Sequence, residues 1–392
     1  MSKLEELLED YCPDGVEFKK LSELGTFYSG LSGKSKKDFS DGNTKFVTYM
    51  NVYKNLAVDL NISDLVKISE KERQNQIEFG DILFTGSSET PDECGLTSVV
   101  TKEATEPIYL NSFCFGLRLK DKTILTPDYT KYVFRSHNVR KQIIRTASGV
   151  TRFNVSKAKM QNVEIPVPPL PVQEELVRIL DMFTELTAEL TAELTARKKQ
   201  YEYYRDQMLE LRRENTPYAR LKNKVVMQRG VRVVRTQLSE EGNYLVFQNS
   251  LTPLGHFDKY NCDGYTPFVI AAGAAAEVGF SNEPFWAADD CFYFDGKNDL
   301  NNRFLYFYLM TKQNYLKSKV RKASVPRLSR NVLENLEIPV PSMDVQKEIV
   351  NILDHFDTLC SDISDGLPAE IEARQKQYEY YRDKLLTFKR KA

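Results

Sequence analysis

Apolar residues at spacings of three and four run through two long segments of the chain. In the first segment, Val172–Met208, the stripe consists of Leu176, Ile179, Leu180, Phe183, Leu186, Leu190 and Leu194. Residues 172–213 contain neither glycine nor proline, so the pattern predicts one helix of about 40 residues, near 60 Å long at about 1.5 Å per residue. The second segment, Val345–Leu385, contains Gly366-Leu367-Pro368. A helix stop followed by a proline start predicts two shorter helices there.

The two segments are near-copies of each other. Both contain the run Lys-Gln-Tyr-Glu-Tyr-Tyr-Arg-Asp, at residues 199–206 and 376–383. The two beginnings lie 173 residues apart and the two runs lie 177 residues apart, so one copy has four extra residues. Such a long apolar stripe has to be buried. We therefore expect the copies to pack as an antiparallel coiled-coil bundle, with one globule at each end.

Short apolar and β-branched runs predict a globule of mixed α and β structure before each helical segment. The expected first-half elements are strands at Val16–Phe18, Val47–Val52, Asp81–Thr85, Leu96–Val100, Phe113–Leu119 and Val163–Pro169, a helix at Asp128–Arg145 and a short helix from Ser156. The expected second-half elements are strands at Leu245–Gln248, Phe268–Ala271, Val278–Ser281 and Cys291–Phe294 and a helix at Asn302–Val320. We predict a mixed α+β or α/β fold with pseudo-two-fold repetition: globules at residues 1–169 and 214–342, helical repeats at 170–213 and 343–392.

Composition narrows the class of protein. A hydrophobic content of 41% can fill ordinary cores, and the longest apolar runs are far too short to cross a bilayer. The N-terminus does not resemble a signal peptide, so we expect a cytoplasmic protein without a membrane partner. The six cysteines lie far apart without a CxxC pair, and there are three histidines. This pattern favours buried thiols over a metal site.

Charge is balanced over the whole chain but not locally. The net charge is −1. Yet residues 131–163 and residues 301–333 each contain eight basic residues and no acidic one, at matching places in the two halves. If each set shares a face, it makes a positive field suited to a polyanion.

Motifs for catalysis are incomplete. Gly30-Leu31-Ser32-Gly33-Lys34-Ser35 ends like a P-loop, but Tyr28 stands where the first glycine belongs, so we interpret Gly30–Lys37 as a basic, flexible loop that could contact DNA phosphates. Asn282-Glu283-Pro284-Phe285 has Glu283 in place of a proline that base-flipping methyltransferases need. Carboxylate clusters such as Glu89–Glu93 lack nuclease spacing and fit exposed turns. We expect no catalytic residues.

The basic loops are the best binding candidates. Arg152 and Arg327 each follow small residues and precede a helix start, at Ser156 or Ser329, and the loop Ala323–Arg327 resembles Ala147–Arg152 with one residue fewer. Arginine can contact phosphate or read guanine edges, whereas the alternative is a solvated basic surface. The candidate DNA-binding residues are Lys36, Lys37, Arg145, Ser148, Arg152, Lys157, Arg321, Ser324, Arg327 and Arg330. The tyrosines Tyr201, Tyr204, Tyr378 and Tyr381 favour bundle packing or a partner interface over base stacking.

With these residues assembled, the chain resembles the DNA specificity (S) subunit of type I restriction-modification systems over its whole length. The resemblance rests on Ile165-Pro166-Val167-Pro168, Ile338-Pro339-Val340-Pro341, the segment Gly366–Tyr378 and the repeated tetrads of Thr187–Leu194. It implies two target recognition domains that each read one part of a split double-stranded DNA sequence. It also implies two modification (methyltransferase) subunits docked on the helices and restriction (translocase/nuclease) subunits. S-adenosylmethionine, ATP and Mg are then expected in those partners, with no cofactor in this chain.

Two other functions stay open at this point. One is a coiled-coil structural adaptor that does not bind DNA, which the acid-free basic segments disfavour. The other is a solitary DNA-modifying enzyme, which the missing cofactor motif disfavours.

Overall fold

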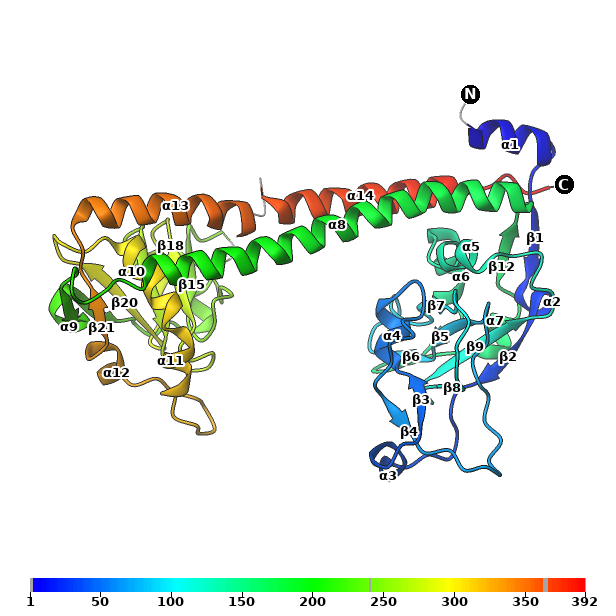
Figure 1. Ribbon diagram of the computed structural model, residues 1–392, viewed down its shortest axis with the longest axis horizontal. Coiled ribbons are helices and arrows are strands. Elements are labelled where there is room, and N and C mark those ends of the chain that lie inside the picture. Colours follow the sequence, from blue (N-terminus) through cyan, green and yellow to red (C-terminus); the bar gives the residue numbers. More distant parts are fainter. Residues whose placement is uncertain (1–2, 240, 362–365, 392) are drawn as a thin grey trace. The chain divides into compact units, whose positions relative to one another are not determined.

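The computed structural model describes residues 3–239, 241–361 and 366–391 (Figure 1). The chain divides into two compact units, unit 1 with Met1–Glu189 and Glu372–Ala392, and unit 2 with Leu190–Ile371. Unit 1 is therefore assembled from both ends of the sequence, and unit 2 from its middle.

Unit 1 is built around an antiparallel four-stranded sheet with the order β2-β9-β5-β7. A second, three-stranded sheet has the order β4-β3-β8, in which β3 and β8 run parallel. The elements before the long helix are α1 (Lys3–Tyr11), β1 (Glu17–Lys20), α2 (Leu21–Leu24), β2 (Gly25–Ser29), α3 (Lys36–Ser40), β3 (Thr44–Val47), α4 (Tyr49–Lys54), β4 (Leu65–Val66), β5 (Ile82–Thr85), β6 (Ser87–Ser88), β7 (Thr97–Val99), β8 (Ile108–Leu110), β9 (Cys114–Leu119), α5 (Pro127–Val133), α6 (His137–Ile144), β10 (Ala147–Ser148), β11 (Phe153–Val155), α7 (Lys157–Met160) and β12 (Glu164–Val167).

Unit 2 repeats this topology with the sheet order β14-β20-β17-β18 and a second sheet, β16-β15-β19, whose pair β15 and β19 is again parallel. Its elements are β13 (Tyr218–Arg220), α9 (Leu221–Lys224), β14 (Val225–Arg229), the 3-10 helix η1 (Arg235–Gln237), β15 (Tyr244–Phe247), β16 (Gly255–Phe257), β17 (Thr266–Ile270), β18 (Val278–Ser281), β19 (Trp286–Ala287), β20 (Cys291–Gly296), α10 (Asn302–Thr311), α11 (Gln313–Ser318), α12 (Arg330–Glu334) and β21 (Glu337–Pro339). The tandem repetition of a mixed α and β globule is thus confirmed.

The helical segments follow their predicted pattern. The first forms a single helix, α8 (Leu170–Leu209), of 40 residues, and the second forms α13 (Met343–Ser361) and α14 (Leu367–Leu385). Residues 362–365, between α13 and Gly366, lie outside the described part of the chain. Val172, Leu176 and Leu180 are fully buried in unit 1, because a spacing of four keeps them on one face of α8.

Each unit combines helices from both copies of the repeat. In unit 1 the ring of Phe183, on α8, stacks on Tyr381 of α14 with centroids 5.4 Å apart. In unit 2 the corresponding stack joins Tyr204 of α8 to Phe356 of α13, at 6.0 Å. The tyrosine run that follows one globule in sequence is therefore packed in the other unit.

Two buried glutamines hold the start of each helical segment. The side-chain nitrogen of Gln173 donates to the carbonyls of Ile124 (2.8 Å) and Pro168 (2.7 Å), and its side-chain oxygen accepts from the Thr126 amide at 2.9 Å. Gln346 forms the same three bonds in unit 2, with Asp299 O, Pro341 O and Asn301 N. Both glutamines are fully buried, so every polar atom of each amide needs the partner it has.

Three predicted elements were wrong in their extent. The expected strand Val47–Val52 ends at Val47, because the Thr48 hydroxyl accepts from the Asn51 amide and caps helix α4. The expected helix Asp128–Arg145 is divided into α5 and α6, and the Ser136 hydroxyl donates to the Val133 carbonyl at the break. The expected helix Asn302–Val320 is likewise divided, at Lys312, into α10 and α11.

Candidate nucleic-acid interface

A short loop in unit 1 presents one of the predicted arginines. We call residues 148–154 loop 1; the strand β11 closes it by pairing Asn154 with Ser148 on one side and with Ser87 on the other. Gly149 has φ +149°, and a Cβ there would lie 1.9 Å from the Arg152 carbonyl oxygen, so only glycine fits. At the tip, Val150 is 90% exposed. Loop 1 therefore projects from the sheet edge in a defined conformation.

The Arg152 side chain is oriented although it is exposed. Its Nε and Nη2 donate to the Ser87 hydroxyl at 3.1 and 2.9 Å, and its guanidinium carbon lies 5.3 Å from the centre of the Phe113 ring. A guanidinium has five N–H groups, so further donors stay available to a ligand. Arg152 is thus presented in one orientation, which a bidentate contact to phosphate or guanine requires.

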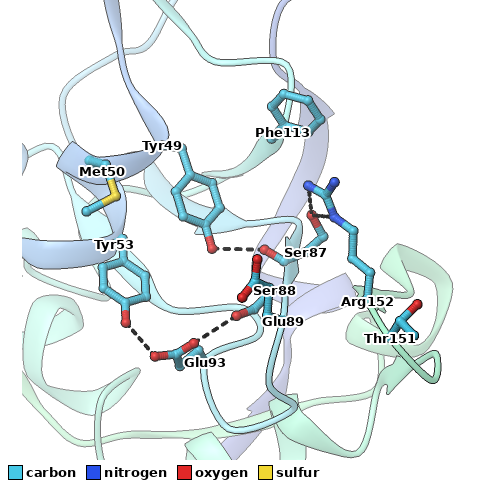
Figure 2. Close-up of a pocket in the computed structure, with 10 residues that line it drawn as sticks. All are labelled: Tyr49, Met50, Tyr53, Ser87, Ser88, Glu89, Glu93, Phe113, Thr151 and Arg152. Atoms are coloured by element: carbon cyan, nitrogen blue, oxygen red, sulfur yellow. Dashed lines mark hydrogen bonds between the residues drawn. The ribbon is translucent and has the colours of Figure 1, made fainter. Parts of the chain in front are cut away.

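Arg152 lies at the edge of a pocket of about 560 Å³ (Figure 2). Figure 2 shows Arg152 and Phe113 on one side of this pocket and Met50 and Tyr53 on the other. We call it the aromatic pocket; its lining residues are Tyr49, Met50, Tyr53, Ser87, Ser88, Glu89, Glu93, Phe113, Thr151 and Arg152.

Glu93 organises the far wall of the aromatic pocket. Its carboxylate accepts hydrogen bonds from Tyr53 (2.6 Å), Ser88 (3.0 Å) and Thr90 (2.9 Å). These bonds, that from Tyr53 most, lower the pKa of the Glu93 carboxyl, so it is ionised at neutral pH. The pocket therefore offers arginine donors, a carboxylate acceptor and the stacked rings of Tyr49 and Tyr53, whose centroids are 6.0 Å apart. Base edges present the matching acceptors and donors.

Sequence reasoning missed Tyr49, Tyr53, Phe113 and Glu93. The predicted exposed turn is present at residues 89–92, but Glu93 at its end is half-buried and has three hydrogen-bond partners. The signal that could have found the two tyrosines is Thr48 as a helix cap, because a helix starting there places Tyr49 and Tyr53, four residues apart, on one face. We find no comparable sequence signal for Phe113 or Glu93.

Lys157, at the start of α7, lies on the other side of Ser87 and Phe113. Its Nζ donates to the Ser29 hydroxyl at 2.6 Å and lies 5.4 Å from the centre of the Phe115 ring. Partial burial lowers the pKa of the Lys157 ammonium. This lysine is therefore held against the last residue of β2 and the aromatic ring of Phe115 in β9.

The other candidates of unit 1 are exposed. Lys36 and Lys37 lie in the short helix α3, so the predicted loop Gly30–Lys37 is not irregular throughout. Within it, Lys34 forms an ion pair with Glu72 and is no longer a simple phosphate contact. Arg145 and Ser148 are exposed at the end of α6 and the start of loop 1.

The predicted positive face of Asp128–Arg145 is mostly occupied internally. The Arg135 guanidinium donates to the carbonyls of Thr97 and Tyr53, and that of Arg140 to the carbonyls of Gly95, Asp92 and Cys94. Burial lowers the pKa of both arginines to about 10. Lys131 pairs with Asp128 and Asp181. A stretch of sequence without acidic residues therefore does not guarantee a free positive surface, because carbonyls and carboxylates from elsewhere in unit 1 bind these cations.

Loop 2 in unit 2, residues 321–327, occupies the place of loop 1 but not with the predicted alignment. The backbone of Arg327 forms two antiparallel β-bridges, one with Arg321 and one with Ala272. Leu328 donates to the Ala271 carbonyl as Val155 donates to that of Gly86. Loop 2 is thus as long as loop 1, rather than one residue shorter. The equivalent pairs are Asn154 with Arg327, Ser148 with Arg321, Thr151 with Ser324 and Arg152 with Val325.

The basic residues of loop 2 are exposed and differ in their surroundings. Arg321, Ser324 and Arg327 are exposed. Arg330 is the equivalent of Lys157, and its Nε donates to the Glu334 carboxylate at 2.8 Å while Nη2 donates to the Met227 carbonyl at 3.1 Å. The two units therefore present different charged side chains from the same backbone frame.

The four candidate tyrosines are of two kinds. Tyr201 is 9% exposed in the core of unit 2, and Tyr378 packs against Tyr132 in unit 1 with ring centroids 6.4 Å apart. Tyr204 and Tyr381 are 39% and 36% exposed beside their phenylalanine partners. Next to them Tyr203 and Tyr380, which we did not select, are each 62% exposed.

Two searches of the described residues bear on other kinds of site. No helix among them is both long and apolar enough to cross a membrane. Likewise, they contain no group of three or more histidine, cysteine, aspartate or glutamate side chains placed to hold a metal ion.

Comparison with known proteins identifies relatives of both halves. The family model of the type I restriction modification DNA specificity domain matches residues 13–197 and 206–373. A putative type I specificity subunit of Mycoplasma pneumoniae is 33% identical over 245 residues, which is 59% of this chain and 99% of that protein. The EcoR124I/EcoR124II specificity subunit of Escherichia coli is 32% identical over 262 residues, 60% of this chain and 65% of that protein.

Solved structures agree on the fold. The type I restriction-modification system S subunit from M. genitalium is 16% identical with a TM-score of 0.56, covering 95% of this chain and 96% of that one. A chain from a structural study of complex assembly and conformational transition of the type I R-M system is 16% identical with a TM-score of 0.63, covering 95% and 97%. At these identities the likeness concerns the fold alone.

Proposed function

Because the chain belongs to the family of type I restriction modification DNA specificity domains, we propose that units 1 and 2 each read one part of a split double-stranded DNA sequence. The chain is the specificity subunit, a recognition component and not a catalytic one. In this proposal two modification subunits dock on the helices and supply S-adenosylmethionine chemistry. Restriction subunits bring ATP-dependent translocation and cleavage with Mg.

One observation supports the proposal above the others: the same backbone loop occurs twice with different exposed side chains. Loop 1 presents Arg152, whereas loop 2 presents Arg321 and Arg327. An arginine that contacts guanine O6 and N7 in the major groove contributes about 1–3 kcal/mol of discrimination. Two loops with different arginines would therefore select two different half-sites.

Site selection tests this function. The chain, assembled with its modification subunits, is incubated with randomised duplex DNA, and bound sequences are read out. We expect a split consensus. Arg152→Ala should relax one position of one half-site, and Arg327→Ala a position of the other half-site only. Lys141→Ala in unit 1 and Lys222→Ala in unit 2, which remove exposed charges outside the two loops, are the matched controls.

The outcomes separate the possible functions. Equal loss at both half-sites from either variant contradicts the assignment of one half-site to each unit. A complex that assembles but selects no sequence contradicts DNA reading altogether and favours an adaptor. Methylation by the chain alone would favour a solitary enzyme.

For docking, we propose the partly exposed aromatic rings of the repeats as contacts to the modification subunits. Tyr204 in unit 2 and Tyr381 in unit 1 are held by stacking on phenylalanine, so little side-chain entropy is lost when a partner covers them. Tyr201 and Tyr378 would support this surface from beneath.

Stoichiometry tests the docking surface. Sedimentation of the wild-type chain with excess modification subunit should show two bound copies. Tyr381→Ala should weaken one of the two binding steps and Tyr204→Ala the other. Thermal unfolding of each variant alone controls for loss of the aromatic stack. Unchanged affinities with intact folding would remove these residues from the interface.

A further inference from the structure

A second pocket in unit 1 adjoins the aromatic pocket. It has a volume of about 400 Å³ and shares Ser87 and Phe113 with the aromatic pocket, so these two residues form the wall between them. We call it the serine pocket. Its lining residues are Ser29, Gly30, Leu31, Ser32, Gly86, Ser87, Ser112, Phe113, Cys114, Phe115, Asn154, Val155 and Lys157.

The chemistry of the serine pocket suits an anion. Lys157 brings a positive charge into a lining that contains serine hydroxyls and an asparagine amide, and none of these described lining residues is a carboxylate. The Lys157 Nζ donates one hydrogen bond, to Ser29, and an ammonium has three N–H groups. A partly buried cation without a carboxylate partner is stabilised by any anion that reaches it.

The equivalent place in unit 2 has the opposite character. Strand pairing makes Ser29 equivalent to Arg229 and Phe115 equivalent to Phe292, so Ser112 and Phe113 correspond to Asp289 and Asp290. Arg330, which replaces Lys157, is already paired with Glu334. The same backbone therefore carries two carboxylates where unit 1 has a hydroxyl and a ring. The anion pocket is a property of unit 1 and not of the repeated frame.

We propose that the serine pocket binds one backbone phosphate of the first half-site, held by Lys157 Nζ and the hydroxyls of Ser29 and Ser112. A phosphate seated there places the adjoining base beside Phe113 and Arg152, at the aromatic pocket. Phosphate contacts position a protein on the duplex and base contacts specify the sequence, so the two pockets would divide these tasks. This inference rests on the proposed function, because the bound phosphate is that of a recognised duplex.

Methylphosphonate scanning of the complex with its modification subunits tests the inference. Phosphates of the selected first half-site are replaced one at a time by neutral methylphosphonates, and affinities are measured for wild type, Lys157→Met and Lys159→Met. Lys159 lies on the same helix and is exposed, so it is the matched control for loss of one charge. In wild type we expect a loss of about tenfold at the bound phosphate, the size of one charge-assisted hydrogen bond.

In Lys157→Met that position-specific loss should disappear, because the group that senses the charge is gone. It should persist in Lys159→Met. Ser29→Ala should reduce it partly and serves as a second variant in case Lys157→Met does not fold, which thermal unfolding reveals. Persistence of every positional loss in Lys157→Met overturns the inference.

A free anion is the other source of the same chemistry. If inorganic phosphate raises the unfolding temperature of wild type but not of Lys157→Met, and no methylphosphonate position depends on Lys157, the pocket takes a small anion and the inference is wrong. The proposed function fails by a different result, namely that wild type selects no split sequence in the first place.

Discussion

Units 1 and 2 share a backbone frame, by which we mean their strand pairing and main-chain hydrogen bonds. They differ in the side chains that this frame presents. Gln173 and Gln346 make the same three hydrogen bonds, and the amides of Gly30 and Gly230 donate to the carbonyls of Cys114 and Cys291 in equivalent turns. The side chains beside the loops do not match. The set Arg152, Ser87 and Phe113 in unit 1 corresponds to Val325, Ala272 and Asp290 in unit 2.

The difference teaches that backbone hydrogen bonds and reading contacts are separable here. The repeated bonds involve main-chain groups, which every sequence supplies, and two buried glutamines. The loop contacts involve side chains, which can change without altering the sheet. A repeat of this kind can read an asymmetric target with a symmetric scaffold.

The largest expected effect breaks a hydrogen-bond network of unit 1 whose central residue, Asp81, is replaced by Thr266 in unit 2. Asp81 is fully buried and accepts from Arg118 Nε (3.0 Å) and Nη2 (2.7 Å), from the Tyr28 hydroxyl (2.7 Å) and from the Glu78 amide (2.8 Å). Asp81→Ala should destabilise unit 1 by about 3–5 kcal/mol, because the Tyr28 hydroxyl and the Glu78 amide lose their buried acceptor and Arg118, which keeps Glu78, loses its second carboxylate partner. Hydrogen exchange resolved by unit measures it.

Unit 2 supplies the control for that change. Strand pairing places Thr266 at the position of Asp81, and Thr266→Val should alter the stability of unit 2 by less than about 1 kcal/mol. Equal effects of the two substitutions would mean that the Asp81 network contributes nothing specific.

Because the two units share the same backbone frame, we predict that equivalent substitutions reduce their stability equally. Gln173→Ala leaves two carbonyls and one amide without partners in unit 1, which should cost about 2–4 kcal/mol. Gln346→Ala should cost the same in unit 2. Denaturant unfolding followed by hydrogen exchange in each unit measures both, and a difference above about 1 kcal/mol would show that the frames are not equivalent.

Transplanting the loop 1 contact sharpens the comparison. The double variant Ala272→Ser/Val325→Arg builds the Arg152 and Ser87 pair into unit 2. It should add a preference for guanine at one position of the second half-site, of about 1–2 kcal/mol. Site selection by the assembled complex measures it, and Val325→Lys, which adds the charge without the planar fork, is the control. An unchanged consensus would show that orientation by Ser87 does not set the preference.

The smallest expected effect is the loss, at low pH, of the stability that Glu175 contributes to unit 1. Hydrogen bonding by Arg178, with a smaller contribution from Lys3, lowers the pKa of the buried Glu175 from 4.5 to about 2. Since the folded pKa is depressed, the stabilisation is present above about pH 4.5 and is lost as the pH falls toward 2. The stability difference between wild type and Glu175→Gln should therefore shrink between pH 5 and pH 2.5.

The long elements could be predicted from sequence because periodicity decides them. The 38 residues of α8 that follow Pro171 contain neither glycine nor proline, which leaves few alternatives to a helix. The division of Asp128–Arg145 could not be predicted in this way, because it depends on the Ser136 hydroxyl competing with the helix for the Val133 carbonyl.

The candidate site was harder to predict than the fold. The exposed Arg152 and the half-buried Arg140 look alike in sequence, and what separates them is whether carbonyls from another part of the chain lie within reach. The alignment of Arg327 with Arg152 failed for a similar reason. Loop equivalence is set by strand pairing, as between Arg327 and Ala272, and not by the order of residue types.

Unit 1 consists of the first and the last part of the chain, which has a consequence for synthesis on the ribosome. Leu176 and Leu180 are buried in one cluster with Leu386, and Val16 exchanges main-chain bonds with Lys389 and Lys391. The 182 residues of unit 2 are translated before Glu372 appears, which takes about 10–40 s at 5–20 residues per second. The half of the protein that is made first is therefore the half that is finished last. The contacts of this apolar cluster with Leu385, Leu386 and Phe388 can form only after the final turns of the chain have emerged.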